Sequence, residues 1–176
     1  MTDLKSLVRA IPDYPKKGII FRDVTTLFAD PAGMRGVVEA MCAPFHYDNI
    51  DTVAGIDARG FILGGAMALE LGKGFVPIRK KGKLPADVYR QEYSLEYGVD
   101  EVEIHIDALT AGARVLLVDD LIATGGTAVA AARLIERAGG SVPAAVFAIA
   151  LPDLGGAEKL NALGIEVHSV MSFAGD

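Results

Sequence analysis

The chain has 176 residues, of which 51% are hydrophobic, and its formal net charge at pH 7 is −6. This length fits a single domain, residues 1–176, and no apolar run approaches the ~20 residues that a membrane-spanning helix needs. The negative charge argues against nonspecific nucleic-acid binding, which normally depends on a basic surface. These bounds favour a soluble protein that binds neither nucleic acid nor membranes.

The N-terminal part of the chain predicts a helix followed by a hood. Residues 1–10 mix charged and apolar side chains, which favours a short amphipathic helix, and they lack the apolar block of a secretory signal, so we expect a cytoplasmic protein. Residues 11–28 are dense in Pro, Gly, Tyr and Phe and are expected to form an ordered hood, within residues 1–30. The single cysteine, Cys42, lies in an apolar helical pattern, which indicates a buried thiol rather than a nucleophile.

Short apolar runs alternate with helical patterns along the rest of the chain. The runs predict buried strands at residues 52–56, 75–78, 114–118, 144–151 and 165–170. The helical patterns stop at glycine, a common C-terminal signal, and cover residues 61–71, 127–138 and 157–163. This alternation predicts an α/β fold with a mostly parallel central sheet flanked by helices. Ligands bind such sheets at the carboxyl ends of the strands.

Residues 80–99 interrupt the alternation, because they carry glycines, a proline, three tyrosines and basic side chains without a helical period. A long segment of this kind in a compact domain is usually functional or mobile, so we expect a mobile loop. The residues that follow, 101–106, alternate strictly between polar and apolar side chains and predict a half-exposed strand.

The stretch with the strongest chemical signal begins at the end of the strand at 114–118. Two acids, Asp119 and Asp120, lead into small residues that open a helix: Ala123, Thr124, Gly125, Gly126 and Thr127. Successive backbone N–H groups at a helix N-terminus, together with two hydroxyls, favour a phosphate monoester. The carboxylates before the loop can then accept hydrogen bonds from the hydroxyls of an attached ribose. The stretch is neither a P-loop, since no lysine follows the glycines, nor a dinucleotide fingerprint.

This stretch resembles the phosphoribosyl pyrophosphate signature of the type I phosphoribosyltransferases. Residues 14–23, 57–61 and 93–98 are similar to segments of the members of this family that use adenine. The resemblance implies the type I phosphoribosyltransferase fold with a small N-terminal hood and a flexible active-site loop. It also implies transfer of the 5-phosphoribosyl group from phosphoribosyl pyrophosphate to adenine, giving AMP and pyrophosphate in purine salvage.

The family resemblance carries expectations about a metal and a partner as well. It implies Mg²⁺ that is bound mainly through phosphoribosyl pyrophosphate, because the sequence shows no dedicated cage of carboxylates. It implies a homodimer, with Tyr89 and Arg90 meeting the neighbouring subunit. The histidines, His46, His105 and His168, are scattered without metal-ligand spacing and are interpreted as structural or surface residues.

Two segments are expected to bind pyrophosphate. Asp57, Ala58 and Arg59 follow the strand at 52–56 and precede a helix, at the same edge of the sheet as the phosphate loop. Their backbone amides and the Arg59 guanidinium suit pyrophosphate, and the resemblance implies a cis peptide bond between Asp57 and Ala58. Some relatives have Ser at position 58, a mild variation because this position mainly offers its backbone.

The second pyrophosphate segment is a basic cluster after the strand at 75–78. In an acidic protein, Arg79 and Lys83 at the ligand edge of the sheet are expected to neutralise part of the pyrophosphate charge. Lys80 and Lys81 belong to the same cluster but are not assigned to the site.

The catalytic and purine-binding residues are implied by the resemblance alone. It places the catalytic group at Glu96, in a loop that closes over the site and excludes water, where a carboxylate can accept or relay the purine N9 proton. It places the purine between Phe21 and Leu121, with backbone groups near Ile20 reading the adenine edge. Arg22 would orient Glu96 or the base. Phe21 also fits a plain place in the hood core.

Two alternatives stay open. One is a phosphoribosyltransferase for a 6-oxopurine, although the C-terminal strand at 165–170 offers no obvious lysine for the exocyclic oxygen. The other is a noncatalytic regulator that binds a purine or phosphoribosyl pyrophosphate and responds through nucleic acid. The negative charge and the lack of an added helix-turn-helix segment oppose it.

Overall fold

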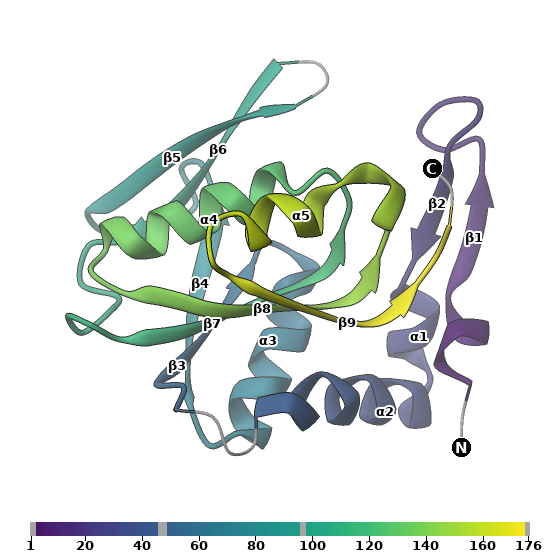
Figure 1. The fold of residues 1–176 in the computed structure, drawn as a ribbon, viewed down its shortest axis with the longest axis horizontal. Coiled ribbons are helices and arrows are strands. Elements are labelled where there is room, and N and C mark those ends of the chain that lie inside the picture. Colours follow the sequence, from purple (N-terminus) through teal and green to yellow (C-terminus); the bar gives the residue numbers. More distant parts are fainter. Residues whose placement is uncertain (1–2, 46–48, 96–97, 175–176) are drawn as a thin grey trace.

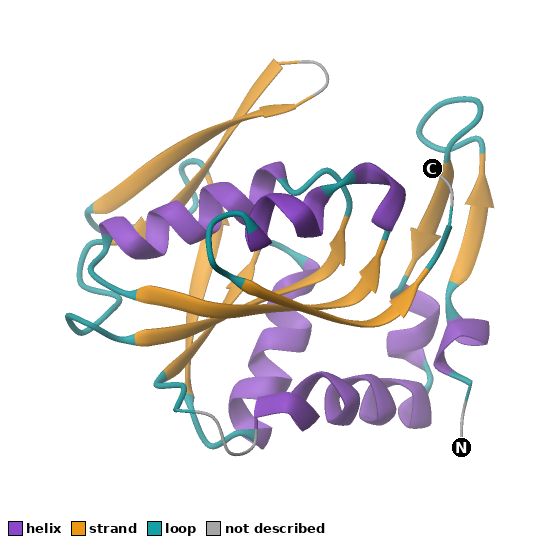
Figure 2. Cartoon of the chain, in the orientation of Figure 1, coloured by secondary structure: helices purple, strands orange, loops and turns teal. Residues whose placement is uncertain are grey.

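The computed structural model describes residues 3–45, 49–95 and 98–174. In these residues seven strands form a central sheet, in the order β5-β6-β4-β3-β7-β8-β9 (Figures 1 and 2). The parallel strands are β3 (Thr52–Ile56), β4 (Gly74–Lys80), β7 (Arg114–Ile122), β8 (Ser141–Ala150) and β9 (Glu166–Ser172). The predicted α/β fold with a mostly parallel sheet is therefore confirmed.

Helices cover both faces of the sheet (Figure 2). On one face lie α2 (Pro31–Cys42) and α3 (Arg59–Glu70), and on the other lie α4 (Gly126–Arg137) and α5 (Gly156–Asn161). Cys42, at the end of α2, is fully buried, as its apolar pattern predicted. None of the helices in the described ranges is long and apolar enough to span a membrane.

The strand register explains why the predicted site residues meet. In the parallel sheet, Gly55 of β3 lies opposite Val118 of β7 and Ile56 lies opposite Ile78 of β4. The residues that follow these positions therefore gather at one edge. β7 runs past the predicted end at 118 to Ile122, so Asp119 and Asp120 lie within the strand rather than after it.

The hood is a hairpin of β1 (Arg9–Pro12) and β2 (Ile20–Asp23), followed by α1 (Thr25–Ala29). The helix predicted for residues 1–10 is confirmed only in part: a short 3-10 helix, η1 (Leu4–Leu7), is present, but Arg9 and Ala10 belong to β1. Pairing of β1 with β2 overrides the local amphipathic pattern, because those residues gain a ladder of cross-strand bonds. Two further 3-10 turns are η2 (Ala43–Phe45) and η3 (Pro152–Leu154).

The segment of residues 80–99, predicted as a mobile loop, is partly a strand. Its second half forms β5 (Val88–Leu95), which pairs antiparallel along β6 (Gly98–His105), and β6 pairs with β4 (Figure 1). The strand predicted at 101–106 is confirmed, but it is not half-exposed, because Glu101 and Glu103 are buried. Their carboxylates are placed beside cations instead of in water: Arg90 Nε lies 3.0 Å from Glu103 Oε1 and 3.7 Å from Glu101 Oε1.

Candidate active site

The phosphate loop lies between the end of β7 and the start of α4. Gly125 caps α4 with a left-handed φ of 79°, a conformation that other residues seldom adopt. The residues predicted to bind the 5′-phosphate and ribose all line one cavity of about 220 Å³: Asp119, Asp120, Ala123, Thr124, Gly125, Gly126 and Thr127. Arg59 lines the same cavity, so the structure brings these two predicted segments together.

The acids of this cavity form a network with Arg59. Arg59 Nε donates to Asp120 Oδ2, and the Asp120 N–H donates to Asp119 Oδ1 at 2.8 Å. Burial, followed by the neighbouring charge of Asp120, holds the pKa of Asp119 well above its usual value. Asp119 can therefore exchange a proton in a range where an exposed aspartate stays ionised.

The second predicted segment, 57–59, forms the turn between β3 and α3. The peptide bond between Asp57 and Ala58 is cis, as the resemblance implied. Arg79 reaches this turn, since its Nε lies 3.4 Å from Asp57 Oδ2, and its Nη1 donates to the backbone carbonyl of Lys83 at 3.1 Å. The structure thus groups Asp57, Arg59 and Arg79, with the exposed Lys83 beside them.

Lys80 was left out of the predicted site, yet it connects the end of β4 to the neighbouring hairpin. Its Nζ donates to the Tyr93 hydroxyl and to Asp100 Oδ2, and the Tyr93 hydroxyl donates to the same oxygen at 2.9 Å. Burial opposes the charged ammonium, but these hydrogen bonds outweigh it and raise the pKa of Lys80. The hydrogen bond from Lys80 lowers the pKa of Asp100. The partners lie 13 and 20 residues away, so no local pattern signals this cluster.

The residues predicted to bind adenine line a second cavity, of about 540 Å³, between the hood and the end of β7. The predicted members are Ile20, Phe21, Arg22 and Leu121. Sequence reasoning missed Lys16, Ile19, Leu151 and Leu154. Of these, Leu151 and Leu154 follow β8 and reach the cavity only through the fold, whereas Lys16 and Ile19 lie inside the recognised segment 14–23 and could have been found there.

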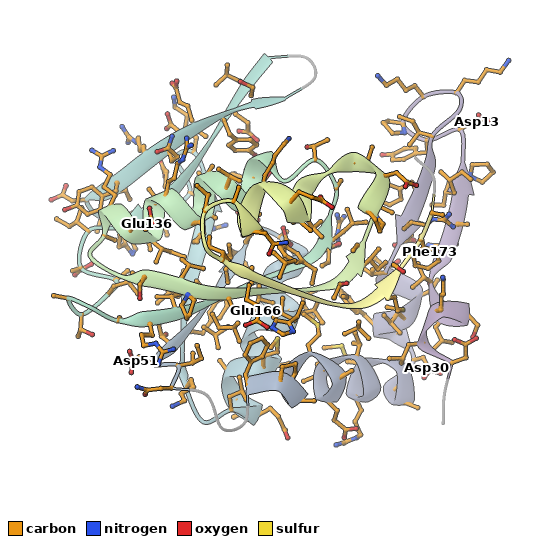
Figure 3. The ribbon with its side chains drawn as sticks, viewed as in Figure 1. Asp13, Asp30, Asp51, Glu136, Glu166 and Phe173 are labelled. Carbon is orange, nitrogen blue, oxygen red and sulfur yellow. The ribbon has the colours of Figure 1, made fainter. Side chains whose placement is uncertain are left out.

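Aromatic contacts fix the hood side of this cavity. Phe21 packs edge-on against Tyr14 with ring centroids 5.3 Å apart, and the Arg22 guanidinium lies 4.5 Å from the centroid of Phe173. Phe173 follows β9 and lies beside the hood (Figure 3). The C-terminal segment therefore helps to place Arg22 at the cavity.

An ion pair between the half-exposed Arg9 and the buried Asp23 closes the hood hairpin. Arg9 Nε donates to Asp23 Oδ2 at 3.0 Å, and Asp23 Oδ1 accepts the Thr25 N–H at 2.9 Å. The Arg9 hydrogen bond, followed by the Thr25 N–H, lowers the pKa of Asp23 to about 2. Asp23 thus links the end of β2 to the start of α1, next to the residues at the purine cavity.

Two predicted residues, Glu96 and His46, lie outside the described residues. Of the other histidines, His168 pairs with Glu166 at 2.9 Å and packs against Phe45. Within the described ranges no group of three or more His, Cys, Asp or Glu side chains is placed to hold a metal ion. At this edge of the sheet, the small-residue loop and the paired acids line one cavity, and the largely apolar second cavity lies beside it.

The chain is similar to known proteins in sequence and in fold. Residues 23–161 match the family model of the phosphoribosyl transferase domain. The adenine phosphoribosyltransferase of Parvibaculum lavamentivorans is 61% identical over 173 residues, which cover 98% of this chain and 99% of that protein. The crystal structure of the adenine phosphoribosyltransferase of Rhodothermus marinus matches with a TM-score of 0.90 at 49% identity. The match covers 97% of this chain and 96% of that chain. The Saccharomyces cerevisiae enzyme, crystallised with adenine and an imino-altritol bisphosphate, matches with a TM-score of 0.89 at 38% identity, over 96% of each chain.

Proposed function

Since the chain belongs to the phosphoribosyl transferase family, and within it to the adenine phosphoribosyltransferases, we propose which residues hold each part of its two substrates. The reaction transfers the 5-phosphoribosyl group of phosphoribosyl pyrophosphate to adenine and gives AMP and pyrophosphate, a step of purine salvage. The observation that carries the assignment is the single cavity in which the phosphate loop, the paired acids and Arg59 meet.

In the proposed site, residues 123–127 bind the 5′-phosphate through backbone N–H groups and the hydroxyls of Thr124 and Thr127. This follows from their place at the N-terminus of α4, where the helix dipole favours an anion. Asp119 and Asp120 accept hydrogen bonds from the ribose hydroxyls. Arg59 holds Asp120 in place and presents the rest of its guanidinium to the pyrophosphate.

The pyrophosphate lies, in this proposal, against the turn of Asp57 and Ala58. Arg79 supplies positive charge from β4, and Lys83 extends that charge at the rim of the site. Because the leaving group carries several negative charges, cations placed where that charge develops stabilise the transition state more than the bound substrate.

Adenine occupies the cavity beside the hood, between Phe21 and Leu121, with the backbone near Ile20 reading its edge and Arg22 at the rim. The apolar walls suit a planar base. The yeast relative was crystallised with adenine, which supports a purine site in this fold. Glu96 accepts or relays the N9 proton as the base attacks the ribose carbon, so catalysis consists of positioning, electrostatics and one proton transfer.

We further propose that Mg²⁺ accompanies phosphoribosyl pyrophosphate. The donor set fits a cation held mainly by the substrate, because the acids available beside the phosphate loop are Asp119 and Asp120, and Asp120 is already bonded to Arg59. Bound there, Mg²⁺ would neutralise part of the pyrophosphate charge. The protein side chains would orient the ribose rather than enclose the ion.

The remaining expectations belong to the same proposal. Residues 1–176 form one domain, with residues 1–30 as the hood and residues 80–99 as the segment that moves over the site. The protein acts as a homodimer, with Tyr89 and Arg90 near the partner. A cytoplasmic location suits a substrate with several phosphate charges, which does not cross a membrane unaided.

The test of the site is the affinity for phosphoribosyl pyrophosphate of a variant with both Asp119→Asn and Asp120→Asn. We expect at least about tenfold weaker binding, because the ribose hydroxyls lose charged acceptors. Asp107→Asn, an exposed acid on another part of the chain, serves as the matched control. Undiminished affinity in the double variant would remove the ribose assignment.

A further inference from the structure

The start of α5 packs directly behind the phosphate loop. A methyl group on Gly156 would lie 2.3 Å from the carbonyl oxygen of Ala123 and 2.8 Å from the backbone nitrogen of Gly125. A methyl group on Gly125 would in turn lie 2.8 Å from Gly156 Cα. Both close approaches are between main chains, which cannot move aside like a flexible side chain. The loop therefore has its present shape only while position 156 carries no side chain.

A charged side chain of the same helix holds the loop from one turn further along. Lys159 Nζ donates to the backbone carbonyl of Thr124 at 2.7 Å. In a planar trans peptide the carbonyl oxygen and the following N–H point in opposite directions. A donor that fixes the Thr124 carbonyl therefore also fixes the direction of the Gly125 N–H.

We propose that Gly156 and Lys159 are positioning residues that keep the phosphate loop in the shape that binds the 5′-phosphate of phosphoribosyl pyrophosphate. The inference rests on the assignment of residues 123–127 to that phosphate. Backbone donors bind an anion well only when they are already aimed at it, because otherwise binding must order the loop. The positive charge of Lys159 beside the loop also favours an anion there.

Neither residue lines the cavity formed by the loop and the paired acids. Their effect should therefore reach the substrates through the loop, and it should fall mainly on the substrate whose phosphate the loop is proposed to bind. Ala123 and Thr124 of the loop also line the proposed adenine cavity, but Gly156 and Lys159 do not line it, so the KM of adenine should change less. A selective effect on phosphoribosyl pyrophosphate separates this role from a general loss of stability.

The experiment compares Lys159→Met, Lys159→Arg and Gly156→Ala in the full chain. Steady-state kinetics give kcat and the KM of each substrate, calorimetry gives the Kd of phosphoribosyl pyrophosphate, and thermal unfolding gives Tm. Lys159→Met should raise the KM and the Kd of phosphoribosyl pyrophosphate about fivefold, with a much smaller effect on the KM of adenine. Lys159→Arg keeps a charged donor and should retain most of the affinity for phosphoribosyl pyrophosphate. Gly156→Ala should raise the Kd about tenfold or more, because the loop main chain must shift.

Matched controls come from the opposite end of the sheet. Lys73→Met removes an exposed lysine, and Gly74→Ala adds a methyl group at an ordinary 3.5 Å from the nearest atom, so both should leave all constants unchanged. Thr127→Val removes a proposed phosphate donor of the loop itself and tests the assignment on which the inference rests.

If Thr127→Val weakens binding while Lys159→Met and Gly156→Ala do not, the role of α5 is wrong and the phosphate site stands. If none of the three weakens binding, the loop assignment fails and the inference fails with it. A fall in Tm without a selective change in the Kd of phosphoribosyl pyrophosphate would show a structural role only and contradict the proposal. Should Gly156→Ala not fold, the two Lys159 variants decide.

Discussion

Arg59, at the start of α3, donates a hydrogen bond from Nε to the carboxylate of Asp120, which is 5% exposed near the end of β7. Two segments that lie 61 residues apart in the chain are thereby joined at one edge of the sheet. Asp119 extends the contact, because it accepts the Asp120 N–H. The proposed pyrophosphate turn and the proposed ribose acids are therefore one connected network. Replacing one of its acids should alter the position of the other acid and of Arg59.

Asp119→Asn should make the free energy of unfolding at pH 7 higher, on the order of 1 kcal/mol. The pKa of Asp119 is raised in the folded protein by burial and by the charge of Asp120, so the folded state holds this proton more tightly than the unfolded chain. Its contribution is thus most favourable below the ordinary aspartate pKa and is lost as the pH rises through the raised value. Denaturant unfolding of both proteins from pH 4 to 8 checks this. Parallel curves for the two proteins would contradict it.

Asp23→Asn should destabilise the protein by about 1 to 2 kcal/mol at pH 7, less than the full pKa shift implies because Arg9 is half exposed. The pKa of Asp23 is lowered to about 2, so its contribution is present above pH 4 and disappears as the pH falls toward 2. Denaturant unfolding at pH 7 and pH 3 measures the loss.

Because Asp23 joins the hood hairpin to α1, its loss should raise the KM of adenine more than that of phosphoribosyl pyrophosphate. Asp107→Asn is again the control, since its side chain is exposed elsewhere. An equal rise of both constants would count against a link between this ion pair and the purine cavity.

Glu96→Gln should lower kcat by roughly a hundredfold and change the Kd of phosphoribosyl pyrophosphate little, because the amide cannot accept the N9 proton. Single-turnover measurements with adenine separate this chemical step from binding. Glu92→Gln, an exposed glutamate on β5, provides the comparison. A Glu96 variant with unchanged turnover would exclude this residue from catalysis.

The sequence predicted the parts of the fold that local patterns determine. The apolar run at 52–56 matches β3 residue for residue, and the small-residue loop opens α4 as the pattern predicted. Both depend on features within a few residues of one another: strand hydrophobicity, glycine conformation and helix capping.

Long-range pairing accounts for what could not be predicted. The segment from 88 to 95 lacks a strong local signal and becomes a strand only because β6 pairs along its whole length. The glutamates at 101 and 103 look exposed by their polarity, yet Arg90 lets them be buried. Lys80 likewise gains its partners, Tyr93 and Asp100, only when that hairpin docks on β4.

The most direct test of the account is pyrophosphate release by the unmodified protein with phosphoribosyl pyrophosphate, Mg²⁺ and, in turn, adenine, hypoxanthine, guanine and xanthine. We predict release with adenine alone, because the cavity between Phe21 and Leu121 is assigned to that base. Pyrophosphate release only with an oxopurine would be compatible with the fold and the phosphate site but would contradict the assignment of the purine cavity. No pyrophosphate release with any of the four bases would contradict the reaction itself.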